Sequence, residues 1–166
     1  MSQQAPTPTQ TLRIERHFQV SPEIAFDTLT KPERMVVWWG PGVDFDIDLR
    51  VGGQWTITRR AGDATYVATG LYQQVERPSR LRYTYTMPQF SPNTDIITVS
   101  ITPTPAVHTP EDHSPAGCIF IFEHSGPDIA QELAELAPGE TSASEAGWQQ
   151  GFDLMEAAWA KESSGG

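Results

Sequence analysis

The sequence has 166 residues, 11 basic and 21 acidic, so its formal net charge is −10. This length suits one domain with its own core, and the negative surface argues against partners that present phosphate backbones or anionic lipid. No apolar run approaches the roughly 20 residues of a membrane span, and the first residues lack the apolar stretch of a secretory signal. We therefore expect a cytoplasmic protein that binds neither nucleic acid nor membranes.

Residues 1–10 are polar and proline-rich, which predicts a flexible tail ahead of a single domain over residues 11–162. Within that domain, alternation of apolar and polar residues is the recurring pattern and is typical of β-strands. It predicts strands over 11–18, 43–50, 54–60, 64–76, 80–87, 95–102 and 117–125. Residues 103–115 contain four prolines and predict a long irregular loop.

Two short helices are predicted after the first strand. Ser21 precedes Pro22, and Thr30 precedes Pro32, and both pairs are typical of a helix start. The glycine–proline–glycine segment at residues 40–42 ends the second helix.

The C-terminal part of the sequence predicts a short helix over 127–136 and a longer one over 142–161. The longer helix opens with Ser142 and Glu145 at the spacing of a capping box. It carries a narrow apolar stripe made of Trp148, Phe152, Met155 and Trp159.

Gly147 and Gly151 lie beside this stripe, one helical turn apart. A glycine costs a helix about 1 kcal/mol relative to alanine. The pair therefore indicates either a close approach of neighbouring backbone or space left for something else, with ordinary helix–strand packing as the alternative.

In chain order these elements predict an α+β domain, in which a curved antiparallel sheet of six to seven strands wraps around the long C-terminal helix. That helix is the only predicted element long enough to cover the apolar face of the sheet. The two short helices would close one end. A curved sheet and a helix commonly enclose a cavity between them.

Several segments carry a resemblance to a known family: SPEIAFDTLTKPERMVVWWGPG, DLRVGGQW, GLYQQVERPSRLRYTY and EAGWQQGFDLMEA. Together they resemble the activator of heat-shock protein 90 ATPase homologues, within the START-like SRPBCC superfamily. The resemblance covers residues 12–160 and implies the helix-grip fold of pollen allergens and polyketide cyclases. It does not imply one function. The sequence departs from the family pattern at the long loop over 103–115.

The adjacent tryptophans of "RMVVWWGPG" point about 100° apart on a short helix and cannot contact the same neighbour. One of Trp38 and Trp39 should pack under the sheet edge. The other either faces a cavity mouth, where its indole N–H needs an acceptor, or is a second core residue.

The sequence shows neither the pattern of a metal site nor that of a nucleophilic cysteine. His17, His108, His113 and His124 have no metal-ligand spacing, so we expect no metal and no bound cofactor. The single cysteine, Cys118, lies in an apolar run and is interpreted as a buried structural thiol.

The predicted strand over 43–50 places Val43, Phe45, Ile47 and Leu49 on its apolar face. Three aspartates share the opposite face and are interpreted as solvated: Asp44, Asp46 and Asp48. Arg50 and Arg59 either pair with these aspartates, which we prefer, or hold a carboxylated ligand.

Aromatic and apolar side chains of the expected inner faces are the candidates for a ligand cavity, with His124 and tyrosine hydroxyls as orienting groups. The set is Trp39, Trp55, Ile57, Tyr72, Tyr83, Tyr85, His124, Trp148, Phe152 and Met155.

We expect a protein that binds a hydrophobic or aromatic small molecule. One alternative is a cyclase- or dehydratase-like enzyme using the same cavity, with a tyrosine or His124 as general acid or base. The other is a module that binds a chaperone and stimulates its ATPase, and homodimerisation stays open. Converging polar groups would favour the enzyme, apolar walls the carrier, and a filled core with an exposed apolar patch the interaction module.

Overall fold

The computed structural model describes residues 10–111, 113–114 and 116–164, so the predicted tail falls almost entirely outside the described residues. Seven strands form one antiparallel sheet in the order β1-β9-β6-β5-β4-β3-β2. Their bounds are β1 Leu12–Phe18, β2 Val43–Ile47, β3 Gln54–Ala61, β4 Ala64–Glu76, β5 Arg80–Tyr85, β6 Asp95–Thr104 and β9 Gly117–Ser125. The predicted curved sheet is confirmed.

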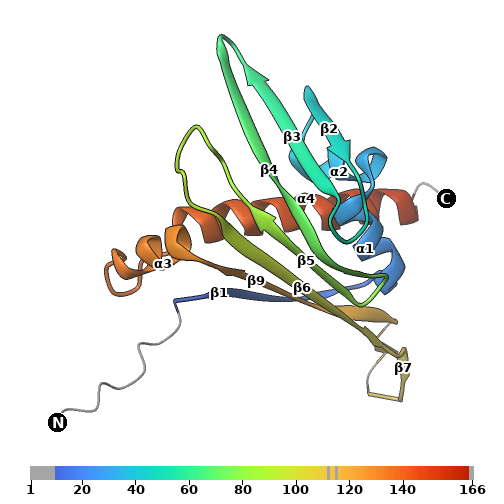
Figure 1. Ribbon diagram of the computed structural model, residues 1–166. Helices are drawn as coiled ribbons and strands as arrows, with labels where there is room; N and C mark the ends of the chain where they lie inside the picture. The colour runs from blue at the N-terminus through green and yellow to red at the C-terminus, as the bar shows by residue number, and fades with distance from the viewer. Residues whose placement is uncertain (1–9, 112, 115, 165–166) are drawn as a thin grey trace.

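Within the described part of the chain, four helices accompany the sheet: α1 Pro22–Thr30, α2 Pro32–Trp39, α3 Pro127–Ala134 and α4 Ala143–Ser164. Figure 1 shows α4 running across the sheet, with α1 and α2 beside its C-terminal half and α3 near its N-terminal end. No helix among the described residues is both long and apolar enough to cross a membrane.

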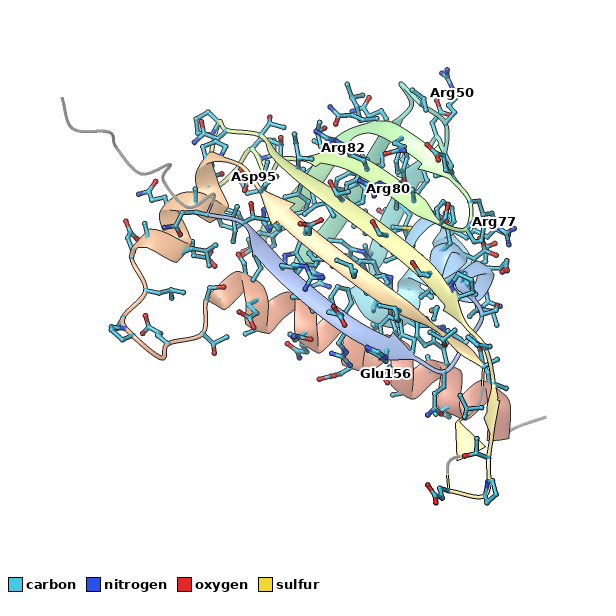
Figure 2. The ribbon with its side chains drawn as sticks, turned by 90° about the horizontal axis from the view of Figure 1, so that it is seen from below. Arg50, Arg77, Arg80, Arg82, Asp95 and Glu156 are labelled. Atoms are coloured by element: carbon cyan, nitrogen blue, oxygen red, sulfur yellow. The ribbon has the colours of Figure 1, made fainter. Side chains whose placement is uncertain are left out.

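The inner face of the sheet is apolar because the strands alternate as the sequence predicts. From Asp95 to Ile101 on β6 and from Cys118 to His124 on β9 every second residue is buried, and most of these positions are aliphatic or aromatic. The opposite face carries exposed charged side chains: Arg80 and Arg82 are exposed on β5 and lie on the outer surface of the sheet (Figure 2).

Helix α4 closes the inner face through its aromatic stripe. The Phe152 ring lies 5.0 Å from that of Phe120 and 5.2 Å from that of Phe122. Near the other end of the helix, the Trp159 ring meets Phe18 edge-on at 4.9 Å. Burial of these large rings is the main contribution of α4 to the stability of the fold.

Helix starts follow the predicted signals with one correction. The Ser21 hydroxyl caps α1 by accepting a hydrogen bond from the Ile24 N–H. Thr30, expected to cap α2, does not do so: its hydroxyl donates to the Phe26 carbonyl within α1, and Lys31 is the cap residue. Thr30 is the last residue of α1, so its side chain bonds back along that helix.

Two other segments differ from expectation. Strand β2 ends at Ile47, and Leu49, expected on the apolar face, is exposed in the turn that follows. The loop predicted over 103–115 begins inside β6, which runs to Thr104. It then contains a two-stranded ribbon of β7, Val107–His108, and β8, His113–Ser114.

Candidate functional site

A cavity of about 700 Å³ lies between the N-terminal half of α4, the C-terminal end of α2, α3 and the sheet. Its volume falls in the range of small-molecule sites. Its walls combine five aromatic rings with three carboxylates and one basic side chain. Its lining residues are Trp38, Trp39, Gly40, Arg59, Tyr85, Met87, Phe90, Ser91, Asp95, His124, Asp128, Ile129, Glu132, Ser144, Gly147, Trp148, Gln150, Gly151 and Leu154.

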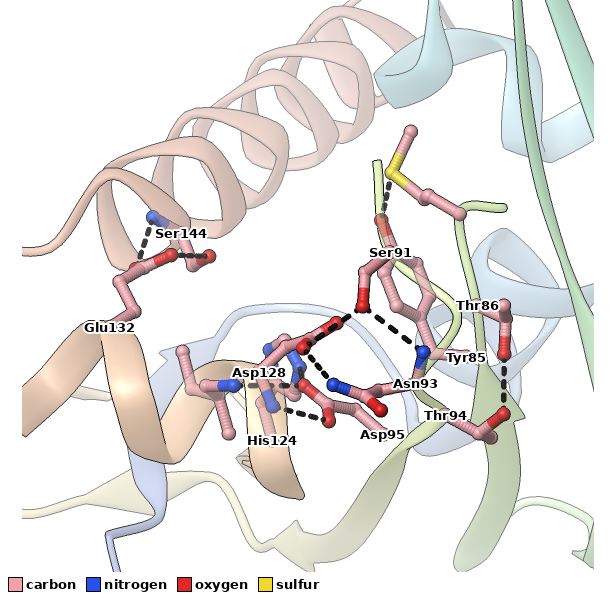
Figure 3. Close-up of polar contacts among 12 residues, drawn as sticks. Tyr85, Thr86, Ser91, Asn93, Thr94, Asp95, His124, Asp128, Glu132 and Ser144 are labelled. Carbon is pink, nitrogen blue, oxygen red and sulfur yellow. Dashed lines mark hydrogen bonds and ion pairs between the residues drawn. The ribbon is translucent and has the colours of Figure 1, made fainter. Parts of the chain in front are cut away.

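A buried carboxylate organises the α3 end of the cavity. Asp95, only 3 % exposed, accepts hydrogen bonds from the backbone N–H groups of Asp128 at 3.1 Å and Ile129 at 3.0 Å. Its Oδ2 also lies 2.8 Å from Nε2 of His124 (Figure 3). Asp95 therefore caps the first turn of α3 and fixes that helix against β6 and β9.

The bonds of His124 determine its charge. The indole Nε1–H of Trp148 can only donate, and it lies 3.2 Å from Nδ1 of His124. Nδ1 must therefore accept, which leaves the ring proton on Nε2, facing Asp95. Burial lowers the pKa of His124, although the Asp95 carboxylate opposes that shift. His124 is thus a neutral imidazole.

Two further carboxylates lie one turn apart on α3 and border the cavity. Asp128 Oδ1 accepts from Ser91 Oγ at 3.1 Å and from Asn93 Nδ2 at 2.9 Å. Glu132 accepts from the backbone N–H and the hydroxyl of Ser144, which joins α3 to the start of α4 (Figure 3).

Tyr85 and Trp148 provide aromatic walls beside these acids, with ring centroids 5.6 Å apart. The Tyr85 hydroxyl lies 3.2 Å from the Met87 sulfur, a weak acceptor. Burial, and to a lesser extent the Asp95 charge, raise the pKa of Tyr85 to about 12. The hydroxyl is therefore protonated at neutral pH.

At the opposite end, the two tryptophans of α2 both border the cavity, and their ring centroids lie 5.2 Å apart. Trp38 is buried and its indole N–H donates to the Thr28 carbonyl at 2.8 Å. Trp39 is half-buried and lines the cavity, and its Nε1 is shielded from solvent without a hydrogen-bond partner. Arg59, expected to pair with an aspartate, instead donates to the Trp39 carbonyl.

The two helix glycines serve the two purposes that the sequence left open. A Cβ built at Gly147 meets no atom within 4 Å, and Gly147 borders the cavity. A Cβ at Gly151 would lie 3.1 Å from Cε3 of Trp38. Gly147 therefore leaves space, and Gly151 allows close packing of α4 on α2.

The structure divides the sequence-predicted cavity residues into three groups. Trp39, Tyr85, His124 and Trp148 line the cavity. Trp55, Ile57, Tyr72 and Tyr83, with Trp39 and Tyr85, surround a separate space of only about 20 Å³. Phe152 and Met155 are fully buried in the core and do not line the cavity.

Sequence reasoning missed the three carboxylates, although a signal was available for each. Asp95 has the strand parity of Ile97, Val99 and Ile101, so its position predicts burial. Asp128 and Glu132 have the four-residue spacing that places two side chains on one helix face.

The remaining candidates are structural. Asp44 and Asp48 are exposed and pair with Arg60 and Arg50, respectively. Cys118 is 1 % exposed, and burial raises the pKa of its thiol to about 11, as expected of a structural cysteine. Among the described residues, no three His, Cys, Asp or Glu side chains form a cluster that could hold a metal ion.

An antiparallel sheet gripping one long C-terminal helix, with two short helices after the first strand, defines the helix-grip class. The family model for activator of Hsp90 ATPase homolog 1-like protein matches residues 19–160, and the chain belongs to this family. No curated protein matches the sequence.

Solved structures show the same fold at low sequence identity. A Rhodobacter sphaeroides protein superposes with a TM-score of 0.71 at 17 % identity, covering 95 % of this chain and 97 % of its own. A Mesorhizobium loti protein gives 0.67 at 23 % identity, with 91 % and 97 % covered. A Staphylococcus aureus protein described as of unknown function gives 0.68 at 17 %, with 93 % and 95 % covered.

Proposed function

We propose that this protein binds a small molecule with a hydrophobic or aromatic body in the cavity between α4, α2, α3 and the sheet. The observation that carries the proposal is the cavity of about 700 Å³ with aromatic walls. Gly147 supports it, because a glycine at an uncrowded helix position lowers helix stability and leaves the cavity open.

A second candidate is an enzyme that uses the same cavity, favoured by the convergence of Asp95 and His124 on one wall. Both ring nitrogens of His124 are already hydrogen-bonded, one to Asp95 and one to Trp148. A general base must face the proton that it removes. His124 would have to break one of these bonds first, so we place binding ahead of catalysis.

The family name raises a third candidate, stimulation of a chaperone ATPase through protein contacts. Such a module is expected to have a filled interior, whereas this chain keeps a large cavity. We rank this function below small-molecule binding.

The experiment that tests binding compares the wild-type chain with Gly147→Leu and Gly147→Ala by calorimetric titration against a panel of hydrophobic and aromatic compounds. The leucine side chain would enter the cavity, whereas the alanine methyl group leaves most of it open. We expect a saturable ligand to lose at least tenfold in affinity with leucine, because the leucine side chain would occupy part of the cavity. With alanine, which adds a single methyl group, we expect a loss of less than twofold. Equal affinity for all three chains would refute binding at this cavity.

A further inference from the structure

The proposed function does not specify the chemical class of the ligand. The charges on the cavity wall indicate which class fits best. Asp95, Asp128 and Glu132 all border the cavity at the α3 end. Among the described residues that line the cavity, Arg59 is the one basic side chain, and it lies at the α2 end, where it donates to the Trp39 carbonyl.

Among the described residues, no lysine or arginine forms an ion pair with any of the three carboxylates. Asp128 and Glu132 instead accept hydrogen bonds from the neutral side chains of Ser91, Asn93 and Ser144. Asp95 has His124 beside it, but the Trp148 indole holds that imidazole in its neutral form. The α3 end of the cavity is therefore anionic.

Aromatic rings lie next to these charges. Trp148 and Tyr85 border the cavity, and both rings lie within 6.0 Å of the His124 ring that contacts Asp95. Phe90 extends the aromatic wall at the rim, 66 % exposed and stacked on Tyr66. Electron-rich ring faces beside carboxylates are the usual surroundings of an organic cation in a protein.

Resting on the proposed function, we infer that the ligand is an organic amine: an aromatic or otherwise apolar body with a protonated nitrogen directed at Asp128 and Glu132. The apolar body would lie along Trp39, Trp148 and the space that Gly147 leaves. Asp128 is the better placed acceptor, since the side-chain hydrogen bonds that it accepts from Ser91 and Asn93 both go to Oδ1.

The test compares three probes of similar shape: naphthylethylamine, naphthylethanol and naphthylacetate, which are cationic, neutral and anionic at neutral pH. Each is titrated calorimetrically into the wild-type chain, Asp128→Asn and the control Asp46→Asn. Asparagine keeps Oδ1 of residue 128 for Ser91 and Asn93 while removing the charge. Asp46 is an exposed carboxylate on β2, so its variant changes net charge equally at a site outside the cavity wall.

We expect the amine to bind the wild-type chain at least tenfold more tightly than the alcohol, and the acid to bind more weakly than either. Asp128→Asn should reduce that preference at least fivefold, and Asp46→Asn less than twofold. Glu132→Gln provides a second variant, with a loss in the same direction, if Asp128→Asn fails to fold.

Alcohol binding as tight as amine binding would overturn the cation preference while leaving the proposed function intact. Amine binding that weakens equally in Asp128→Asn and Asp46→Asn would overturn the assignment to this wall. If none of the three probes binds, both the inference and the proposed cavity function fail.

Discussion

Replacement of the two α4 glycines by alanine should affect stability differently, although the glycines are one turn apart on the same helix. At Gly147 a Cβ meets nothing within 4 Å. Alanine there gains the helix propensity that glycine lacks, about 1 kcal/mol. At Gly151 the Cβ would meet the Trp38 ring at 3.1 Å. That contact is tighter than an ordinary carbon–carbon separation, so overpacking of about 1–3 kcal/mol cancels or exceeds the same propensity gain.

Thermal unfolding followed by circular dichroism measures both effects. For a domain of this size, 1 kcal/mol corresponds to about 2–4 °C in Tm. We expect Gly147→Ala to raise Tm by about that amount and Gly151→Ala to lower it or leave it unchanged. A lower Tm for Gly147→Ala would show that the space beside residue 147 is filled, and equal shifts for both variants would refute the contrast drawn between the two positions.

Three further outcomes are expected. Trp38→Phe should lower the free energy of unfolding by about 1–3 kcal/mol in urea denaturation, because the indole donates to the buried Thr28 carbonyl; an unchanged midpoint would contradict that bond. The pKa of His124 is lowered by burial from its ordinary value of 6.5, so the unfolded chain binds the proton more tightly. The stability contributed by neutral His124 is complete above about pH 6.5 and is lost as the pH falls below it; His124→Gln should flatten that part of the Tm–pH profile, and an unaltered profile would count against a neutral buried imidazole. Cys118 should react with a disulfide reagent only on unfolding, since burial raises its pKa to about 11; fast labelling of the native chain would be inconsistent with that burial.

Periodicity was enough to predict the fold. Strands β4 and β9 have the predicted bounds, 64–76 and 117–125, because each bears alternating residues between clear turn signals. Leu49 was misassigned because alternation continues beyond the last paired residue of β2, and periodicity alone does not show where pairing stops. Thr30 was misassigned because a threonine hydroxyl can either accept from a backbone N–H of the following helix or donate to a carbonyl of the preceding one. Only the geometry where α1 meets α2 selects the second bond, to the Phe26 carbonyl.

The site was harder to predict than the fold, because it depends on which side chains of different elements meet. The aromatic stripe of α4 predicted one face, yet only Trp148 of its four members borders the cavity, while Phe152 and Met155 fill the core. The sequence identified His124 but not its partner Asp95, which is 29 positions earlier in the chain. That pairing follows from the antiparallel register of β6 and β9, which places Ile97 opposite His124.

The most direct test of the central claim, that the cavity binds an aromatic small molecule, is a titration followed by the tryptophan indole N–H resonances in nuclear magnetic resonance spectra. Trp39 and Trp148 line the cavity, whereas Trp159 lies outside its walls and donates to the Thr28 hydroxyl at 3.1 Å. With naphthylethylamine as the probe, we expect saturable shifts of the Trp39 and Trp148 signals and a stationary Trp159 signal. Stationary Trp39 and Trp148 signals at saturating probe, or a Trp159 signal that moves as far as theirs, would contradict that claim.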